Sequence, residues 1–195
     1  MNKRLILPLV CLTLTLAAAV AVPLFRYFEY RDIARHGEKL MFRVDGFDPY
    51  DPFRGRFVRI RLEPDSMNIP SSLSLKQRWK VDGFAEFRTG PDGCAQAVGF
   101  SEEKPSGGTF WYMRNCWISG TNNNNEKLFF SYPVDRFYMN ELLAPEAEKV
   151  MRDVHKLPEI RAEVRLKSGT GLIREIYVDG IPLAEYIRRQ NTARR

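Results

Sequence analysis

An uncharged apolar run near the N-terminus, Leu5 to Phe25, is the feature that most constrains what this 195-residue chain can fold into. Its 21 residues follow Lys3 and Arg4. A helix of about 20 apolar residues crosses a hydrocarbon core of roughly 30 Å, and basic residues before it favour a cytoplasmic N-terminus. The run predicts a single-pass anchor (residues 1–25) in the inner, cytoplasmic membrane, with a C-terminal domain on the periplasmic side.

A cleaved secretory signal is the main alternative for the same segment. Ala19 and Ala21 are small enough to permit cleavage after Ala21, which would release the protein into the periplasm. The apolar run, however, is longer than the roughly 7 to 15 residues of a signal core, and Pro23-Leu24-Phe25 extends it past that site. We favour the anchor over the cleaved signal, and both over a soluble cytoplasmic protein with an apolar N-terminal helix.

The net charge of +6 is concentrated at the two ends of the chain. Lys3 and Arg4 precede the apolar run, and four arginines lie in the tail 188–195. Residues 26–187 carry equal numbers of basic and acidic side chains, so the folded body is neutral. This distribution argues against nucleic acid as a partner, since nucleic-acid binding needs a basic surface. The tail reads most simply as a solvated end that could also touch anionic lipid.

The remaining residues have the length and composition of one domain. Residues 26–38 mix aromatic and charged residues and predict a juxtamembrane stalk, and residues 39–187 predict an exported β-rich domain. The alternation of Val58, Ile60 and Leu62 with arginines indicates a strand with one buried face. The hairpin pattern of residues 159–180 follows one predicted helix, from about Pro145 to Lys156.

These patterns predict a mainly β, α+β fold. We expect an antiparallel sheet folded as an open barrel or a sandwich, with one main helix packed on it and a short helix near residues 183–189. An N-terminal transmembrane helix precedes this domain. We see no internal repeat and no second domain boundary.

Two cysteines of the body lie symmetrically about a turn. Cys94 and Cys116 are equidistant from Pro105, in a segment whose pattern indicates strand, turn and strand. Cysteines at equal distances from a hairpin turn face each other across two antiparallel strands. We therefore expect a disulfide in an oxidising compartment, with two unpaired buried thiols as the alternative.

The segment "DPYDPFRG" crowds two Asp-Pro steps and an Arg-Gly into eight residues. Each proline holds the aspartate before it in an extended conformation, which predicts a rigid double turn around Asp48, Asp51, Arg54 and Gly55. In the structural interpretation the Arg54 guanidinium is bonded to Asp48 or Asp51, and Arg54→Ala lowers the melting temperature. In the functional interpretation Arg54 contacts a ligand.

At these residues the chain resembles the GDYXXLXY family, whose members are bacterial membrane-anchored proteins of unknown function. The motif aligns with Gly55 to Leu62, "GRFVRIRL". Arg56 replaces its aspartate, and Phe57 and Leu62 replace its tyrosines, while Ile60 keeps the apolar character of its leucine. The loss of the polar groups with retention of the apolar ones implies a fold signature rather than a catalytic site.

Residues with catalytic or metal-binding chemistry are sparse. His36 and His155 are the two histidines, and no zinc, phosphate-loop or nucleophile-elbow motif occurs. We assign no catalytic, cofactor-binding or metal residue. A membrane-anchored serine hydrolase with Ser66 and a base at Lys76 or Lys80 remains a distant alternative, because no lysine lies in an apolar run that would lower its pKa.

The aromatic block "TFWYMRNCW" offers a binding face of Trp111, Tyr112 and Trp117. Alternation places Trp111 and Trp117 on the same side of a strand, where they would form core or stack on a ligand. A periplasmic domain that binds cell-wall sugar or peptide is thus the second function hypothesis. The first is a non-enzymatic scaffold or accessory subunit that binds another membrane or periplasmic protein and is held in the bilayer by residues 5–25.

Overall fold

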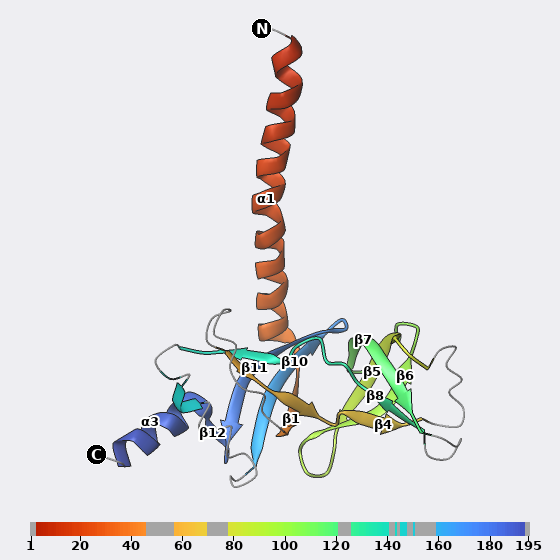
Figure 1. Cartoon of the computed structure of the whole chain (residues 1–195), viewed down its shortest axis with the longest axis vertical. Helices are drawn as coiled ribbons and strands as arrows, with labels where there is room; N and C mark the ends of the chain where they lie inside the picture. Colours follow the sequence, from red (N-terminus) through yellow and green to blue (C-terminus); the bar gives the residue numbers. More distant parts are fainter. Residues whose placement is uncertain are drawn as a thin grey trace.

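The computed structural model describes residues 3–45, 57–69, 78–120, 126–140, 143, 145–147, 150 and 159–193. A single long helix, α1 (Lys3–His36), stands on a β-rich domain (Figure 1). The helix includes the apolar run and residues 26–36 of the predicted stalk, and Glu38 already belongs to the first strand. The part from Pro8 to His36 is long and apolar enough to cross a membrane, and its most apolar stretch is not buried by the domain. This is the composition of a single-pass anchor or of a signal sequence.

The domain is mainly β and antiparallel, as predicted. The first sheet has the order β12-β11-β10-β1-β3 and lies directly below the helix (Figure 1). Its strands are β1 (Glu38–Asp45), β3 (Arg61–Glu63), β10 (Ile160–Lys167), β11 (Thr170–Val178) and β12 (Ile181–Pro182). The β10–β11 hairpin is the one predicted from the sequence of residues 159–180.

The second sheet curves into an open barrel with the order β4-β8-β7-β5-β6. Its strands are β4 (Ser66–Asn68), β5 (Val81–Thr89), β6 (Ala95–Ser101), β7 (Phe110–Ser119) and β8 (Lys127–Phe129). A two-stranded pair, β2 (Phe57–Arg59) with β9 (Arg136–Tyr138), lies beside β11 of the first sheet. In the described part of the chain, β4 and β6 each have a neighbour on one side only.

The predicted strand of residues 57–62 is divided between two pairings. β2 pairs with β9, β3 pairs with β1, and the Ile60 amide between them donates to the Asp135 carbonyl at 2.8 Å. Ile60 and Leu62 are both buried. The apolar positions of the motif therefore serve the core.

An aromatic cluster joins the two sheets. Phe42 from β1, Phe87 from β5 and Trp111 from β7 are fully buried, and the Phe42 ring centroid lies 5.2 Å from that of Phe87 and 6.0 Å from that of Trp111. Tyr132 packs on the same rings and donates its hydroxyl to the Pro64 carbonyl at 2.5 Å. Burial raises the pKa of Tyr132 well above its usual value, so it stays a neutral donor.

The helices of the C-terminal part follow the sequence pattern where the structure describes them. Residues 145–147 and 150 are helical, in agreement with the predicted helix from about Pro145, and residues 151–158 lie outside the described residues. The last helix, α3 (Leu183–Ala193), begins at the predicted residue and buries Leu183 and Ile187 against the first sheet.

The predicted disulfide is wrong. Cys94 and Cys116 are both buried free thiols. The hairpin interpretation failed because β5 lies between β6 and β7 in the sheet. Cys116 pairs with Val81 at the start of β5, whereas the Cys94 carbonyl accepts from Gly90, just after its end. The two thiols therefore lie at opposite ends of a nine-residue strand.

Candidate functional site

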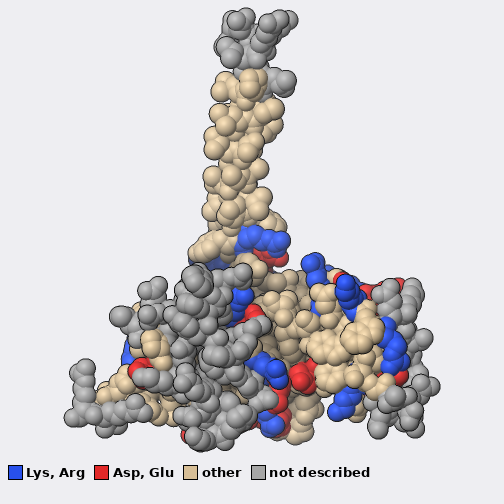
Figure 2. Space-filling model, viewed as in Figure 1, with Lys and Arg blue, Asp and Glu red and all other residues tan. Residues whose placement is uncertain are grey.

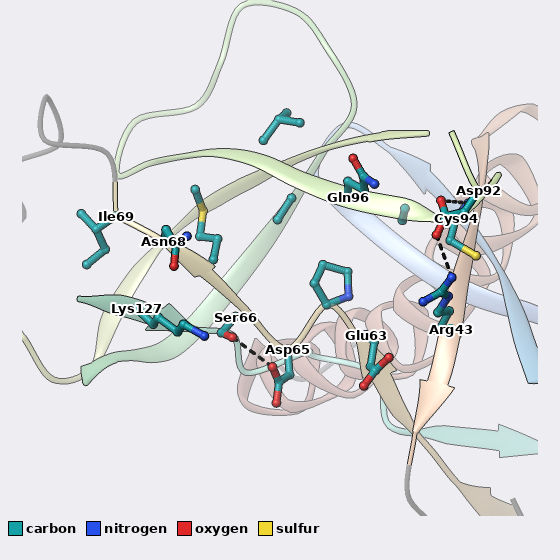
Figure 3. Close-up of a pocket in the computed structure, with 15 residues that line it drawn as sticks. Arg43, Glu63, Asp65, Ser66, Asn68, Ile69, Asp92, Cys94, Gln96 and Lys127 are labelled. Carbon is teal, nitrogen blue, oxygen red and sulfur yellow. Dashed lines mark hydrogen bonds and ion pairs between the residues drawn. The ribbon is translucent and has the colours of Figure 1, made fainter. Parts of the chain in front are cut away.

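The gap in the open barrel forms a groove between β4 and β6, which we call the strand groove. It has a volume of about 710 Å³ and is lined by residues 63–69, residues 94–98, Arg43, Asp92 and Lys127. Figure 3 shows Asn68, Ile69 and Lys127 at one end and Arg43, Asp92 and Cys94 at the other, with Glu63 and Asp65 between them. Its volume is in the range of ligand-binding clefts.

The outer edge of β4 presents unpaired backbone groups to the groove. The Phe130 amide donates to the Asp65 carbonyl at 2.8 Å, and the Ile69 amide donates to the Glu126 backbone carbonyl at 3.1 Å. Antiparallel pairing alternates between bonded and non-bonded residue pairs. The backbone groups of Ser66 and Asn68 therefore point away from β8, towards the groove, and no other described strand pairs with them.

The facing edge of β6 has the same character. The Gly90 amide donates to the Cys94 carbonyl at 2.8 Å, which makes Cys94 and Gln96 the residues whose backbone bonds to β5. By the same alternation, the backbone N–H and C=O groups of Ala95 and Ala97 point away from β5. Two open strand edges thus face one groove.

Side chains give the groove an apolar floor and a polar rim. Met67, Ile69 and Ala97 are partly buried and pack on the core, so they form the floor. Asn68 and Gln96 are exposed. An extended chain that entered the groove would meet apolar contacts on one face and polar groups on the other, which is the alternation a strand provides.

Charges are arranged differently at the two ends of the groove. Arg43 contacts Asp92 at 3.0 Å and Glu159 at 3.6 Å. The hydrogen bond with Cys94 and the charge of Asp92 raise the pKa of Arg43, so this end is a closed ionic cluster. At the other end, Lys127 has no carboxylate partner within the described residues.

The base of the helix is held by a second set of polar contacts, which we call the anchor junction. Arg165 donates to the Gly37 carbonyl at 3.2 Å, Arg174 donates to the Ala34 carbonyl at 3.1 Å, and Lys167 pairs with Asp32 at 2.6 Å. Arg174 satisfies a carbonyl of the last helical turn, which has no partner within the helix, and Arg165 satisfies the carbonyl of the residue just after the helix. The helix is therefore fixed to β10 and β11.

Glu163 lies at the centre of the anchor junction. Its side chain is 5% exposed and contacts Arg165 at 2.9 Å, Lys39 at 3.3 Å and Arg174 at 4.0 Å. Tyr177 donates to it at 3.2 Å. Burial alone would raise its pKa, but the bonds and charges of Lys39 and Arg165 outweigh burial and lower the pKa below its usual value. Glu163 is thus a buried anion with its cations in place.

The predicted aromatic face is divided. Trp111 is fully buried, Tyr112 is half-buried, and Trp117 is exposed and stacks on Phe129 with ring centroids 5.4 Å apart. Asn115 has a φ of 55°, and the register with β5 shifts beside it, which reverses the alternation along β7. Trp111 and Trp117 therefore point to opposite sides, and the same-side prediction is wrong.

The other predicted residues are placed as follows. Asp48, Asp51, Arg54 and Gly55 lie outside the described residues, and so does Lys76. Ser66 lies on β4 with its hydroxyl donated to Asp65 at 3.1 Å, and no hydrogen bond joins it to Lys80. Among the described residues, no three His, Cys, Asp or Glu side chains could hold a metal ion.

The strand groove itself was not foreseen, because no local pattern encodes it. Its walls come from strands that are about thirty positions apart in the sequence and whose outer edges are left open by long-range pairing. The three-residue length of β4 is typical of a strand at a sheet edge.

Fold and sites together define the class: a β-rich domain, with an open-barrel sheet, carried on a helix of membrane-spanning length and composition. The amino-acid sequence places the chain in a particular protein family. Residues 19–176 match the GDYXXLXY protein family, and the chain belongs to it. No curated protein and no solved structure matches the chain.

Proposed function

We propose that the chain is a non-enzymatic, single-pass membrane protein that binds an extended segment of another membrane or periplasmic protein in its strand groove. In this proposal residues 5–25 span the inner membrane and the β domain lies on the periplasmic side. The observation that carries the proposal is the pair of open strand edges facing one groove.

Backbone hydrogen bonding is the main support. An added strand binds through its main chain at an exposed sheet edge, while pockets beside it select alternate side chains. Here Ser66 and Asn68 on one wall, and Ala95 and Ala97 on the other, offer backbone donors and acceptors to a single inserted strand. Because parts of β4 and β6 lie within 8 Å of each other, less than the roughly 9.6 Å that two strand spacings require, that strand would bond one open edge and contact the other through side chains.

The side chains of the groove specify the occupant further. Apolar side chains of the inserted strand would lie on Met67, Ile69 and Ala97. On the opposite face, an acidic side chain would complement Lys127, and a basic one would complement Glu63 and Asp65. These preferences favour a polypeptide with alternating character over a sugar.

The anchor junction supports a scaffold or accessory role. A helix whose last turn and following residue are held by Arg174 and Arg165 keeps the groove at a fixed height above the bilayer. A partner anchored in the same membrane gains effective concentration when a rigid support presents the site at its own level.

Site-specific photocrosslinking in intact membranes tests the proposal with the full-length chain. A photoreactive residue at Gln96, which lines the groove, should capture a protein partner, and the same residue at Arg188 on α3 should not. Asn68→Pro should abolish the Gln96 adduct, because proline removes a backbone donor that points into the groove. Asn68→Thr is the matched control and should retain it.

Three results would count against the proposal. They are an adduct that Asn68→Pro leaves unchanged, equal capture from position 188, and recovery of a glycan in place of a protein. An alkaline phosphatase fusion after Arg195 should be active, and an inactive fusion in a chain that reaches the membrane would contradict the orientation.

A further inference from the structure

We propose that a second pocket, beside the base of α1, binds the phosphate group of an anionic phospholipid from the membrane that holds the helix. This headgroup pocket has a volume of about 500 Å³. Its walls come from Tyr30 of α1, Phe84 of β5, Tyr112 and Arg114 of β7, Lys104, and the hairpin tip 168–171. The inference rests on different residues from the strand groove and stands or falls independently of it.

The position of the pocket matches the headgroup layer. Tyr30 follows Phe25, the last residue of the apolar run, by five residues, which is about 7.5 Å along a helix. The headgroup region on each side of the hydrocarbon core is roughly 5 to 7.5 Å thick. Tyr27 and Phe28 are exposed at the same level, as is typical of aromatic residues at a membrane interface. The pocket therefore lies where lipid phosphates are.

The headgroup pocket is built by contacts between the two sheets. The Tyr112 amide donates to the Gly169 carbonyl at 2.9 Å, which fixes the β10–β11 hairpin tip against β7. Gly169 has a φ of 90°, and a Cβ there would lie 3.3 Å from both the Phe84 and Phe110 rings. The tip thus needs glycine to approach this aromatic wall. Figure 1 shows the tip near β7, on the side of the domain that faces α1.

Among the described residues, the charged side chains that line the pocket are positive. Lys104 and Arg114 are its charged lining residues, and none of the others is acidic. The Lys104 ammonium lies 6.0 Å from the Phe110 ring centroid, and the Arg114 guanidinium lies 5.6 Å from that of Tyr112. Neither forms an ion pair within the described residues.

These two cations differ from most of the other basic residues around the helix. Figure 2 shows Lys and Arg side chains on the side of the domain nearest to α1, and those of the anchor junction already have carboxylate or carbonyl partners. Lys104 and Arg114 instead make cation–π contacts with aromatic rings, which attract a cation without neutralising its charge. Guanidinium and hydroxyl donors, here Arg114, Ser168 and Thr170, are the groups that bind phosphate oxygens.

Native mass spectrometry of the full chain, released from nanodiscs, tests this inference. Nanodiscs of mixed phosphatidylcholine and phosphatidylglycerol should yield protein that retains the anionic lipid, and nanodiscs of phosphatidylcholine alone should yield little retained lipid. Lys104→Gln and Arg114→Gln should each reduce retention about fivefold, and the double variant about thirtyfold, from the usual contribution of a basic residue at a membrane surface.

Two further variants separate the pocket from general attraction between opposite charges. Val134→Trp fills the pocket without changing the charge and should reduce retention as strongly as Arg114→Gln. Arg188→Gln removes an exposed charge on α3 and should change nothing. Melting temperatures of all variants within a few degrees of the parent show that the fold is intact.

Several outcomes would overturn the inference. They are equal retention of the two lipids, retention unchanged in the double variant, and a loss for Arg188→Gln equal to that for Arg114→Gln. Displacement of the lipid by glycerol phosphate at the same molar concentration would identify a soluble phosphate, rather than a lipid, as the ligand.

Discussion

The anchor junction and the strand groove belong to the same small domain, but the polar groups of the junction are paired and many of those in the groove are not. At the junction, Glu163 has three cations around it, and two arginines donate to backbone carbonyls in and just after the last helical turn. In the groove, two strand edges and Lys127 have no partner within the described residues. The difference indicates that a network whose charges and hydrogen bonds are all paired holds the helix to the sheet. Backbone and charged groups without a partner, as in the groove, can bind another molecule.

The largest effect should come from removing the centre of the junction. Glu163→Ala leaves Lys39, Arg165 and Arg174 without their shared anion, and we expect a loss of about 3 kcal/mol in the free energy of unfolding. For a domain of this size that is a fall of roughly 6 to 12 °C in melting temperature. Differential scanning fluorimetry of the detergent-solubilised chain measures it.

The matched change in the groove is Lys127→Gln. It should alter the free energy of unfolding by less than about 0.5 kcal/mol, since the lysine has no ion-pair partner to lose. If both variants lose the same stability, the contrast between a saturated and an unsaturated region is wrong.

A smaller loss is expected where the helix meets the first strand. A Cβ on Gly37 would lie 2.4 Å from the Ile33 carbonyl oxygen and 3.1 Å from the Arg165 Cβ, so the helix end must shift. Gly37→Ala should cost about 2 kcal/mol and speed hydrogen exchange in the last helix turn. Gly107→Ala is the control, because nothing lies within 4 Å of its added methyl group. Unchanged exchange in Gly37→Ala would mean that the junction is looser than its contacts indicate.

The β4 wall of the groove is held by a hydrogen bond from Tyr132, and the third prediction concerns this bond. Tyr132→Phe removes the bond to the Pro64 carbonyl between β3 and β4, and the loss should be about 1 kcal/mol. Tyr112→Phe is the comparison, because its hydroxyl has no hydrogen-bond partner within the described residues. Urea denaturation of both proteins measures the difference, and equal midpoints would contradict a role for Tyr132 in positioning β4.

The smallest expected effect is the change in the stabilisation by Glu163 at low pH. The folded pKa of Glu163 is below its ordinary value of 4.5, so its stabilisation is fully present above about pH 4.5 and is lost as the pH falls through the folded pKa. The gap in melting temperature between the parent and Glu163→Ala should be constant from pH 7 to pH 5 and should narrow below pH 4.5. A gap that widens in acid would contradict the assigned charge of Glu163.

Local pattern was enough to predict the helix, the β class and the closing hairpin, because each depends on residues close in sequence. The apolar run needs only its own composition, and residues 159–180 alternate around one turn. Two predictions failed where the structure depends on distant pairing. Cys94 and Cys116 required knowledge that β5 lies between their strands, and Trp117 required knowledge of the register shift beside Asn115.

The same reasoning explains why the candidate sites were not predicted. Ser66, Asn68, Ala95 and Ala97 matter through backbone groups, whose pairing no side-chain pattern reveals. Lys104 and Arg114 come together with Tyr30 only because the β10–β11 tip reaches β7. The short motif that suggested the family instead marked buried positions of the core.

The arrangement of the two buried thiols has a consequence for how the protein matures. With β5 between them, Cys94 and Cys116 cannot reach each other in the native state, and the pKa of Cys116 is raised by burial, which keeps its sulfur protonated and unreactive. The native domain therefore needs no oxidant and no disulfide isomerase to be complete. It should reach the same folded form in reducing and oxidising surroundings, because its core is completed by strand pairing and packing rather than by a covalent link.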